Sequence, residues 1–209
     1  MLQAEKWVVM NFENAIRGAR NAMNSWDRSD SYYDPAGRFV LGANDLKLAR
    51  QLARAGSDHR KFLRQVFVSV DITAPLYWWK EFDTYKVGTV ACSTSTMHKL
   101  HARPLTREDF SHDRLSAAAT VQLDSLIAFL EAERQAYVQT KDPLHWHNLI
   151  QLLPSSYRQL RTVSCNYEVL INMYAARKNH KLPEWQTLCG MFKDLPYAAE
   201  LILLGEEVP

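Results

Sequence analysis

The segment VFVSVDIT, residues 66–73, carries the clearest strand pattern in the chain. Apolar and polar side chains alternate along it, and its β-branched residues favour an extended backbone. Pro75 closes the pattern, because proline has no backbone N–H for a further sheet hydrogen bond. The stretch APLYWWKEFDTYK follows, and we expect a short helix to begin after Pro75. The sequence therefore predicts a strand that leads into a short helix.

Helical periodicity dominates the chain on both sides of this strand. Apolar residues recur three and four positions apart, as they do on the buried face of a helix. Because this pattern resumes after each break in the later part of the chain, little strand is expected beyond residue 138. The pattern predicts helices at residues 12–24, 45–55, 113–138, 144–153, 155–165, 166–177 and 183–204.

Two segments lack a helical period. Residues 25–44, SWDRSDSYYDPAGRFVLGAN, are rich in Asp, Ser, Gly and Pro and predict a loop long enough to act as a functional flap. Residues 87–96, VGTVACSTST, consist of small and β-prone residues and fit either a strand or a loop. The sequence as a whole predicts an α+β fold, mainly helical with a small β-sheet, in a single domain over residues 1–209.

Composition excludes few classes of protein. The 25 Lys and Arg residues nearly balance the 23 Asp and Glu residues, and the resulting net charge of +2 indicates no particular partner. Cys92, Cys165 and Cys189 are odd in number and far apart, so no complete disulfide framework is expected. No stretch approaches the roughly 20 apolar residues of a membrane span. We therefore predict a cytoplasmic protein that neither crosses a membrane nor carries a signal peptide.

Metal binding is not expected. Cys92, His98 and His101 form one cluster of possible ligands, and His145 and His147 form another. Neither cluster has the four-ligand spacing of a structural zinc site.

Several short motifs, in this order, resemble the flavin-dependent thymidylate synthases. They are IRGARNAM at residues 16–23, ARAGSDHRKFLR at 53–64, the strand ending in Ala74-Pro75, and LLPSSYRQLRTVSCNYEVLINMYAARKNHKLPEW at 152–185. The resemblance covers roughly residues 10–190. It implies FAD as cofactor, dUMP as substrate, NADPH and methylenetetrahydrofolate as co-substrates, and a homotetramer whose sites are assembled from several subunits.

The signature motif of that family, R-H-R-x-x-S-x-N-E-x-S-x-R, falls on TYKVGTVACSTST at residues 84–96. Only Lys86, Thr89 and Thr94 are conservative replacements there. In the family these basic and hydroxyl groups hold flavin and nucleotide phosphate, so the resemblance marks Lys86 and Thr94 as candidate substrate-binding residues. The missing arginines matter because threonine supplies neither their charge nor their paired N–H donors.

The later part of the family's site is better preserved. The resemblance places Asn166 and Asn172 at flavin-contacting asparagines and Arg177 at the arginine that contacts the pyrimidine and favours its N3-deprotonated form. Glu168 stands where the family has an arginine. If residues 166–177 form one helix, Asn166 and Arg177 share a face about 16 Å apart, while Asn172 points elsewhere. Asn166 also fits an ordinary helix N-cap, and Arg177 an ordinary arginine at a helix C-terminus.

His59 lies near the family's flavin-proximal histidine, within a basic cluster that extends to Arg64. Clustered cations beside a loop suit a dinucleotide phosphate, although a solvated charged turn has the same composition. His59 is therefore a third candidate for cofactor binding. The same cluster is the one feature that would support nucleic-acid binding, which salt-sensitive association with DNA or RNA would reveal.

Two functions follow from the resemblance. The first is a divergent enzyme that uses FAD to methylate or otherwise modify C5 of dUMP or a related pyrimidine nucleotide, with Arg177 as its catalytic residue. The second is a catalytically silent homologue that keeps the fold as a nucleotide-binding or scaffold protein. The altered segment 84–96 favours the second, whereas the residues between Asn166 and Arg177 favour the first.

Overall fold

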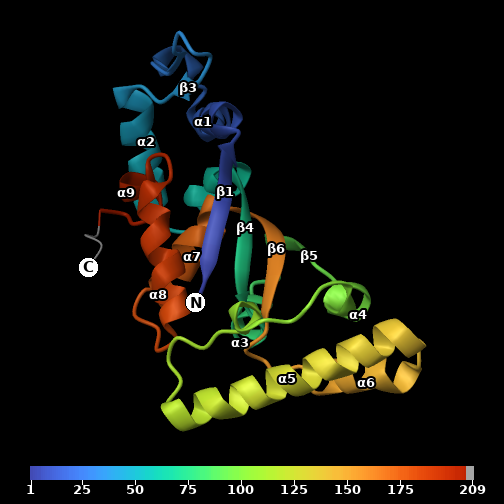
Figure 1. Ribbon diagram of the computed structural model, residues 1–209. Helices are drawn as coiled ribbons and strands as arrows, with labels where there is room; N and C mark the ends of the chain where they lie inside the picture. The colour runs from blue at the N-terminus through green and yellow to red at the C-terminus, as the bar shows by residue number, and fades with distance from the viewer. Residues whose placement is uncertain (206–209) are drawn as a thin grey trace. The chain divides into compact units, whose positions relative to one another are not determined.

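The computed structural model describes residues 1–205 and contains a four-stranded sheet and a separate two-stranded one. The larger sheet has the order β1-β4-β6-β5, so β4 lies between β1 and β6 (Figure 1). Strand β4 runs antiparallel to β6, because Leu76 donates its N–H to Tyr157 at one end and Tyr167 donates to Val66 at the other. The strands are β1 (Gln3–Met10), β2 (Tyr32–Tyr33), β3 (Phe39–Val40), β4 (Phe67–Pro75), β5 (Val90–Ser93) and β6 (Arg158–Asn166).

Helices make up most of the remaining regular structure. The α-helices are α1 (Phe12–Arg20), α2 (Ala43–Arg54), α3 (Leu76–Phe82), α4 (Thr96–Lys99), α5 (Ala117–Thr140), α6 (Pro143–Gln151), α7 (Tyr167–Arg177), α8 (Pro183–Met191) and α9 (Ala198–Leu201). Short 3₁₀ helices are η1 (Asn21–Met23), η2 (Trp26–Arg28), η3 (Arg60–Gln65), η4 (Leu100–Ala102), η5 (Arg107–Asp109) and η6 (Phe192–Asp194). The α+β class, mainly helical with a small sheet, is confirmed.

Most of the local predictions are confirmed. Strand β4 and helix α3 meet at Pro75 as expected, and helices occupy the predicted segments near residues 12, 45, 113, 144, 166 and 183. The segment 87–96 contains β5, and the predicted loop at 25–44 carries the small hairpin of β2 and β3, in which Tyr32 pairs with Val40.

Two predictions about strands are wrong. Residues 155–165, predicted as helix, contain β6, and the expectation of little strand beyond residue 138 fails with it. Gln159, Val163 and Cys165 are buried while Thr162 and Ser164 are exposed, so burial in this strand follows a two-residue period toward its end. Strand β1 was not predicted, because its first residues, QAEK, are mostly polar and the alternation of burial along the strand is not evident from the sequence.

The described chain forms two compact units. The first comprises residues 1–5, 71–84 and 91–162, and the second comprises residues 6–70, 85–90 and the chain from residue 163 onward. Each strand of the larger sheet contributes residues to both units. That the whole chain acts as a single domain stays a prediction.

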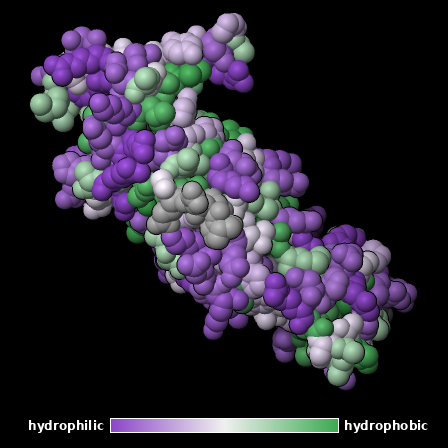
Figure 2. All heavy atoms as spheres, turned by 90° about the vertical axis from the view of Figure 1, so that its left-hand side faces the viewer, coloured by the Kyte–Doolittle hydropathy of each residue, from purple (hydrophilic) through white to green (hydrophobic). Residues whose placement is uncertain are grey.

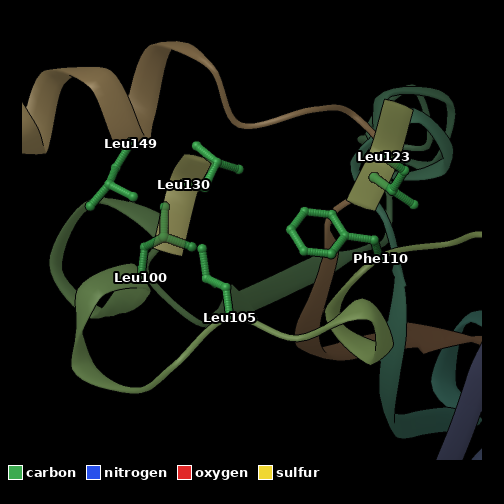
Figure 3. Packing of buried hydrophobic residues seen from close by; sticks show 6 residues of the cluster. All are labelled: Leu100, Leu105, Phe110, Leu123, Leu130 and Leu149. Carbon is green, nitrogen blue, oxygen red and sulfur yellow. The ribbon is translucent and has the colours of Figure 1, made fainter. Parts of the chain in front are cut away.

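The core of the first unit is a cluster of leucines around one phenylalanine. Figure 3 shows Leu100, Leu105, Phe110, Leu130 and Leu149 turned toward a common centre, and Leu123 also belongs to this cluster. Each such side chain contributes about 1.5–3 kcal/mol when it leaves water. Helix α5 begins at the N-cap Ser116, and α6 begins at Asp142 followed by Pro143, which is favoured at a first helical position.

The core of the second unit surrounds α7. Most residues of this helix are buried, and it packs against η3 and α8, while Asn172, Ala175 and Ala176 form an exposed stripe. The Tyr167 ring lies edge-on to Phe12 at 5.5 Å between centroids, and the Trp185 ring of α8 is fully buried. Such packing fixes the backbone of α7, while the residues predicted to bind a ligand, Asn166, Asn172 and Arg177, keep part of their surface exposed.

The surface gives no sign of a bilayer-spanning helix. Within residues 1–205 no helix combines the length and the apolar character that crossing a membrane requires. On the face shown in Figure 2, hydrophilic residues predominate and hydrophobic ones gather in small separate areas.

Candidate functional site

Asn166 joins β6 to α7 and caps the helix. Its side-chain oxygen accepts the N–H of Val169 at 3.1 Å, so the N-cap interpretation is confirmed. Gly88 lies close to it with a positive φ of 79°, and a Cβ at this position would stand 3.0 Å from both the Asn166 amide nitrogen and Val169. Residues 85–90 can therefore lie against the start of α7 only because residue 88 has no side chain.

A cavity of about 530 Å³ opens at this point and is called here the α7 cavity. Asn166 and Asn172 both line it, together with Glu168. The expectation that Asn172 points away from Asn166 is wrong, because Asn166 has an extended backbone (φ −141°, ψ 169°) and does not follow the helical rotation. Two of the three residues predicted to hold a cofactor therefore share one cavity.

Two arginines enter the α7 cavity, and Glu168 binds both of them. The Glu168 side chain, only 10% exposed, forms ion pairs with Arg64 and, at 3.5 Å, with Arg60. Its hydrogen bond raises the pKa of Arg64, so this arginine stays charged. Arg60 also donates to the Asn172 side-chain oxygen at 3.3 Å. The carboxylate that replaces the family's arginine thus cancels one of the two positive charges beside it.

Arg177 lies at the other end of α7 among aromatic rings. Its Nε donates to the Tyr85 hydroxyl at 3.1 Å, and its guanidinium carbon is 4.9 Å from the centre of the Trp185 ring. Cation–π contact and the hydrogen bond together fix its orientation. Tyr85 lies within the segment 84–96, which the resemblance aligned with the signature motif, so this altered segment contacts the arginine predicted to be catalytic.

His59 lines a different cavity from the two asparagines. This cavity, of about 560 Å³ and called here the α1 cavity, is formed by α1 together with Asp58, His59, Lys61 and Arg64. Arg64 lines the α7 cavity as well, so the two cavities share one cationic side chain. Lys86 is exposed in the segment 85–90 and lines neither cavity.

Thr94 belongs to the first compact unit, where it lines a cavity of about 330 Å³, called here the Thr94 cavity. Lys99, Arg103 and Arg158 line it too, beside the hydroxyl groups of Ser95 and Tyr157. These three cations were not among the predicted site residues, although Lys99 and Arg103 follow the hydroxyl-rich run STST closely enough to have suggested an anion site.

Within residues 1–205, one of these three cations forms an ion pair with a carboxylate. Arg103 pairs with Asp109; burial alone would raise the pKa of Asp109, but hydrogen bonds from Arg103 and Thr106 outweigh it and lower that pKa. Arg158 donates to the Glu108 carbonyl at 3.2 Å and to Gln3 at 2.8 Å. Its Nε is buried and has no hydrogen-bond partner among the described residues. A buried N–H of this kind is a donor for an anion that enters the cavity.

The described residues offer little for metal or thiol chemistry. Within residues 1–205, His, Cys, Asp and Glu side chains form no group of three or more that would hold a metal ion. Burial raises the pKa of Cys165 and of Cys189 to about 12, so both remain protonated thiols at neutral pH.

Comparisons with known proteins identify the fold. No family model matches the chain, and no curated protein matches it in sequence. Thymidylate synthase X (ThyX) from Helicobacter pylori, solved with FAD and dUMP, aligns with a TM-score of 0.73 and 17% identity over 97% of each chain. A second Helicobacter pylori ThyX structure, complexed with FAD and dUMP, gives 0.69 and 18% over 96% of this chain and 97% of that one.

A related enzyme also aligns. The UMP/dUMP methylase PolB from Streptomyces cacaoi, bound with 5-Br dUMP, gives a TM-score of 0.62 and 15% identity over 98% of this chain and 92% of that one. The chain therefore has the fold of flavin-dependent thymidylate synthases, and the fold resemblance inferred from its motifs is confirmed.

Proposed function

We propose that the protein is a divergent flavin-dependent enzyme that binds FAD and a pyrimidine nucleotide such as dUMP and modifies C5 of its ring. One observation carries the proposal: Asn172 and Arg177 lie on α7 and Asn166 caps it, in a fold shared with enzymes solved with FAD and dUMP. Their amide and guanidinium groups are of the kinds that bind ring edges and phosphates.

The donors present fit a flavin dinucleotide. The α7 and α1 cavities share Arg64 and together offer the cations Arg60 and Lys61. Glu168 and Asp58 oppose these three cations, which leaves an excess of positive charge for a pyrophosphate. Asn166 and Asn172 add amide groups, and His59 adds a ring nitrogen. FAD, when bound by these residues, supplies hydride transfer.

Arg177 is the residue we assign to the pyrimidine. Its planar guanidinium can present parallel N–H groups to a ring carbonyl and the adjacent deprotonated nitrogen. Tyr85 and Trp185 hold that plane in a defined orientation. Lys86 and Thr94 complete the assignment as substrate-binding residues, and the cations around Thr94 suit a nucleotide phosphate.

The proposed co-substrates, oligomeric state and location in the cell are taken from the family that the chain resembles. NADPH would supply electrons and methylenetetrahydrofolate the carbon, in a cytoplasmic homotetramer whose sites draw on several subunits.

The purified protein's visible spectrum tests the cofactor. We expect a yellow protein that releases FAD on denaturation, or one that takes up added FAD. A colourless protein that ignores both FAD and dUMP would instead support the catalytically silent homologue. The internal ion pairs of Arg60 and Arg64 with Glu168 favour that second function, because they use charge that a phosphate would otherwise meet.

Replacing Arg177 tests the substrate. Arg177→Ala removes a charged donor from the proposed ring contact, so we expect dUMP affinity to fall at least about tenfold while the helical circular dichroism stays unchanged. Arg50→Ala, at an exposed position of α2, is the matched control and should bind as the parent does. Unchanged dUMP affinity in a folded Arg177→Ala protein would remove Arg177 from the site.

A further inference from the structure

A third cavity in the second unit has no part in the proposed function. It has a volume of about 510 Å³ and lies between α2 and the chain that runs from the end of α1 to η2. Three cations line it, Arg20, Arg28 and Lys47, and its described lining includes no carboxylate. We call this space the basic cavity.

Two of these cations carry a charge that the protein leaves uncancelled. Arg20 is only 5% exposed and pairs with the fully buried Asp45 at 2.6 Å. Arg28 and Lys47 are exposed, and neither forms an ion pair with a carboxylate of residues 1–205. Because two like charges line an open space that has no carboxylate in its lining, the basic cavity attracts anions.

A neighbouring space, called here the aromatic cavity, shares Arg20 with the basic cavity. It has a volume of about 310 Å³ and lies between α1 and the hairpin of β2 and β3. Trp26, Tyr32 and Tyr33 line it, yet they remain 49%, 56% and 57% exposed. Half-exposed aromatic rings gathered around a concave space are typical of binding surfaces.

Internal hydrogen bonds fix the loop that contributes to both cavities. Arg20 donates to the Arg28 carbonyl at 3.1 Å, and Asp45 accepts the hydroxyl groups of Ser29 and Ser31 at 2.6 Å each. Burial alone would raise the pKa of Asp45, but the hydrogen bonds from the two serines and from Arg20 outweigh it and lower that pKa. Asp45 therefore stays charged at neutral pH and holds the backbone around η2 in one arrangement.

The rings are held at their polar ends as well. The Trp26 indole N–H donates to Asn21 at 2.9 Å, and the Tyr33 hydroxyl donates to Glu13 at 2.5 Å. Tyr33 also packs edge to face with Phe39, with 5.5 Å between the ring centroids. Rings that are already held in place need little further ordering when a planar ligand stacks on them.

Rings and cations follow one another along this short loop. Helix η2 contributes Trp26 to the aromatic cavity and Arg28, two positions later, to the basic cavity. Single-stranded nucleic acid carries the matching groups, because every nucleotide joins a planar base to a phosphate. A duplex has the same phosphates but keeps its bases stacked inside, so exposed rings favour single strands over duplexes.

We propose that the basic cavity and the aromatic cavity together bind single-stranded nucleic acid. Bases stack on Trp26, Tyr32 and Tyr33, while backbone phosphates meet Arg28 and Lys47. None of these five residues lines the α7, α1 or Thr94 cavity, so the inference holds whether or not the protein binds FAD or dUMP.

This surface differs from the basic cluster of residues 59–64, which the sequence singled out for nucleic acid. Two cations of that cluster, Arg60 and Arg64, form ion pairs with Glu168. Arg28 and Lys47 have no such partners among the described residues, and exposed aromatic rings lie in the adjoining cavity.

Fluorescence anisotropy of the full chain with labelled oligonucleotides tests the proposal. The probes are oligoadenylate and oligodeoxyadenylate of about twelve nucleotides, together with a duplex of the same length. Adenine probes offer no pyrimidine to the site proposed for dUMP. We expect the single strands to bind about tenfold more tightly than the duplex and to quench tryptophan fluorescence. Comparing the two single strands shows whether the protein prefers RNA or DNA.

Salt and variants separate the phosphate contacts from stacking. Two phosphate contacts should weaken binding about sevenfold between about 50 and 200 mM salt. Arg28→Gln and Lys47→Gln should each reduce this salt dependence, whereas Trp26→Ala should lower the affinity about tenfold and leave the salt dependence unchanged. Lys193→Gln removes the same charge from an exposed position in η6 and should have no effect. Circular dichroism must show that each variant is folded.

Three results would overturn the proposal. Neither single-stranded probe binds; or the duplex binds as tightly as the single strands; or folded Arg28→Gln and Trp26→Ala proteins bind as the parent does. If the single strands fail to bind and Trp26→Ala converts an assembled protein into a smaller species in sedimentation, the rings instead belong to a contact between copies of the chain.

Discussion

The α7 cavity and the Thr94 cavity are both lined by arginines, but they balance charge differently. In the first, a single carboxylate, Glu168, pairs with both Arg60 and Arg64. In the second, Asp109 pairs with Arg103, while Lys99 and Arg158 form no ion pair with any described carboxylate. The types of residue that line a cavity therefore do not show how much positive charge is available to a ligand. That charge depends on which of the cations already form ion pairs within the protein.

Two half-buried arginines have different kinds of partner in the two cavities. Arg60 is only 18% exposed and approaches the buried helix α7, where an unpaired charge would cost several kcal/mol. Arg158 donates to two neutral oxygen atoms instead, which leave its charge uncancelled and its buried Nε–H without a partner among the described residues. Glu168 therefore stabilises both arginines of the α7 cavity, whereas Arg158 of the Thr94 cavity keeps an uncancelled charge and a buried Nε–H for an anion, although Glu108 also lines that cavity.

The largest expected effect is on stability at Glu168. Glu168→Ala leaves two arginines unpaired, and we expect the free energy of unfolding to fall by about 2 kcal/mol. The loss stays below that of a fully buried pair because Arg64 is 56% exposed. Urea denaturation measures it. The same variant should bind inorganic phosphate more tightly, since both guanidinium groups are released.

Two further variants show whether these effects come from the loss of the Glu168 charge or from the loss of its side-chain volume. Glu168→Gln keeps the side-chain volume and should give a smaller loss of stability with the same gain in phosphate affinity. Asp27→Asn removes an exposed carboxylate elsewhere in the second unit and should change neither quantity. A stable Glu168→Ala protein with unaltered phosphate affinity would contradict the charge-cancelling role.

The next effect concerns the Thr94 cavity. Arg158→Gln removes an uncancelled charge and a buried donor, and we expect affinity for phosphate and for dUMP to fall about tenfold, near 1.4 kcal/mol. Isothermal titration calorimetry measures both affinities. Arg114→Gln, at an exposed position in the same unit, is the control. Equal affinities in the parent and in Arg158→Gln would show that this cavity holds no anion.

Local patterns in the sequence were enough to predict the elements around Pro75 and helix α7. Alternation defines β4, proline ends it, and Asn166 caps α7 as an N-cap signal predicts. Strand β6 could not be recognised in this way, because its identity depends on partners far along the chain. Trp79 donates to the Gln159 carbonyl at 3.0 Å, and Thr162 donates to Asp71 at 2.6 Å.

The candidate site likewise contains residues that local sequence patterns could predict and residues that they could not. Asn166, Asn172 and Arg177 were predicted because they lie within one short motif of the family resemblance. The partners that determine their surroundings come from elsewhere: Arg60 reaches Glu168 from η3, and Tyr85 reaches Arg177 from the altered signature segment. No spacing rule connects residues 108 or 92 positions apart, so these contacts emerge only from the folded chain.

The smallest effect concerns Arg177, which donates to a neutral oxygen, the Tyr85 hydroxyl, as Arg158 of the Thr94 cavity donates to neutral oxygens. Tyr85→Phe removes the hydroxyl that accepts from Arg177 but keeps the ring beside its guanidinium. If the hydroxyl competes with the nucleotide for that donor, dUMP affinity should rise about fivefold, since one such hydrogen bond contributes roughly 1 kcal/mol. A lower affinity would mean that the hydroxyl positions Arg177 for the ring, and then Arg177→Lys, which cannot keep the planar orientation, should lose affinity to the same extent as Arg177→Ala.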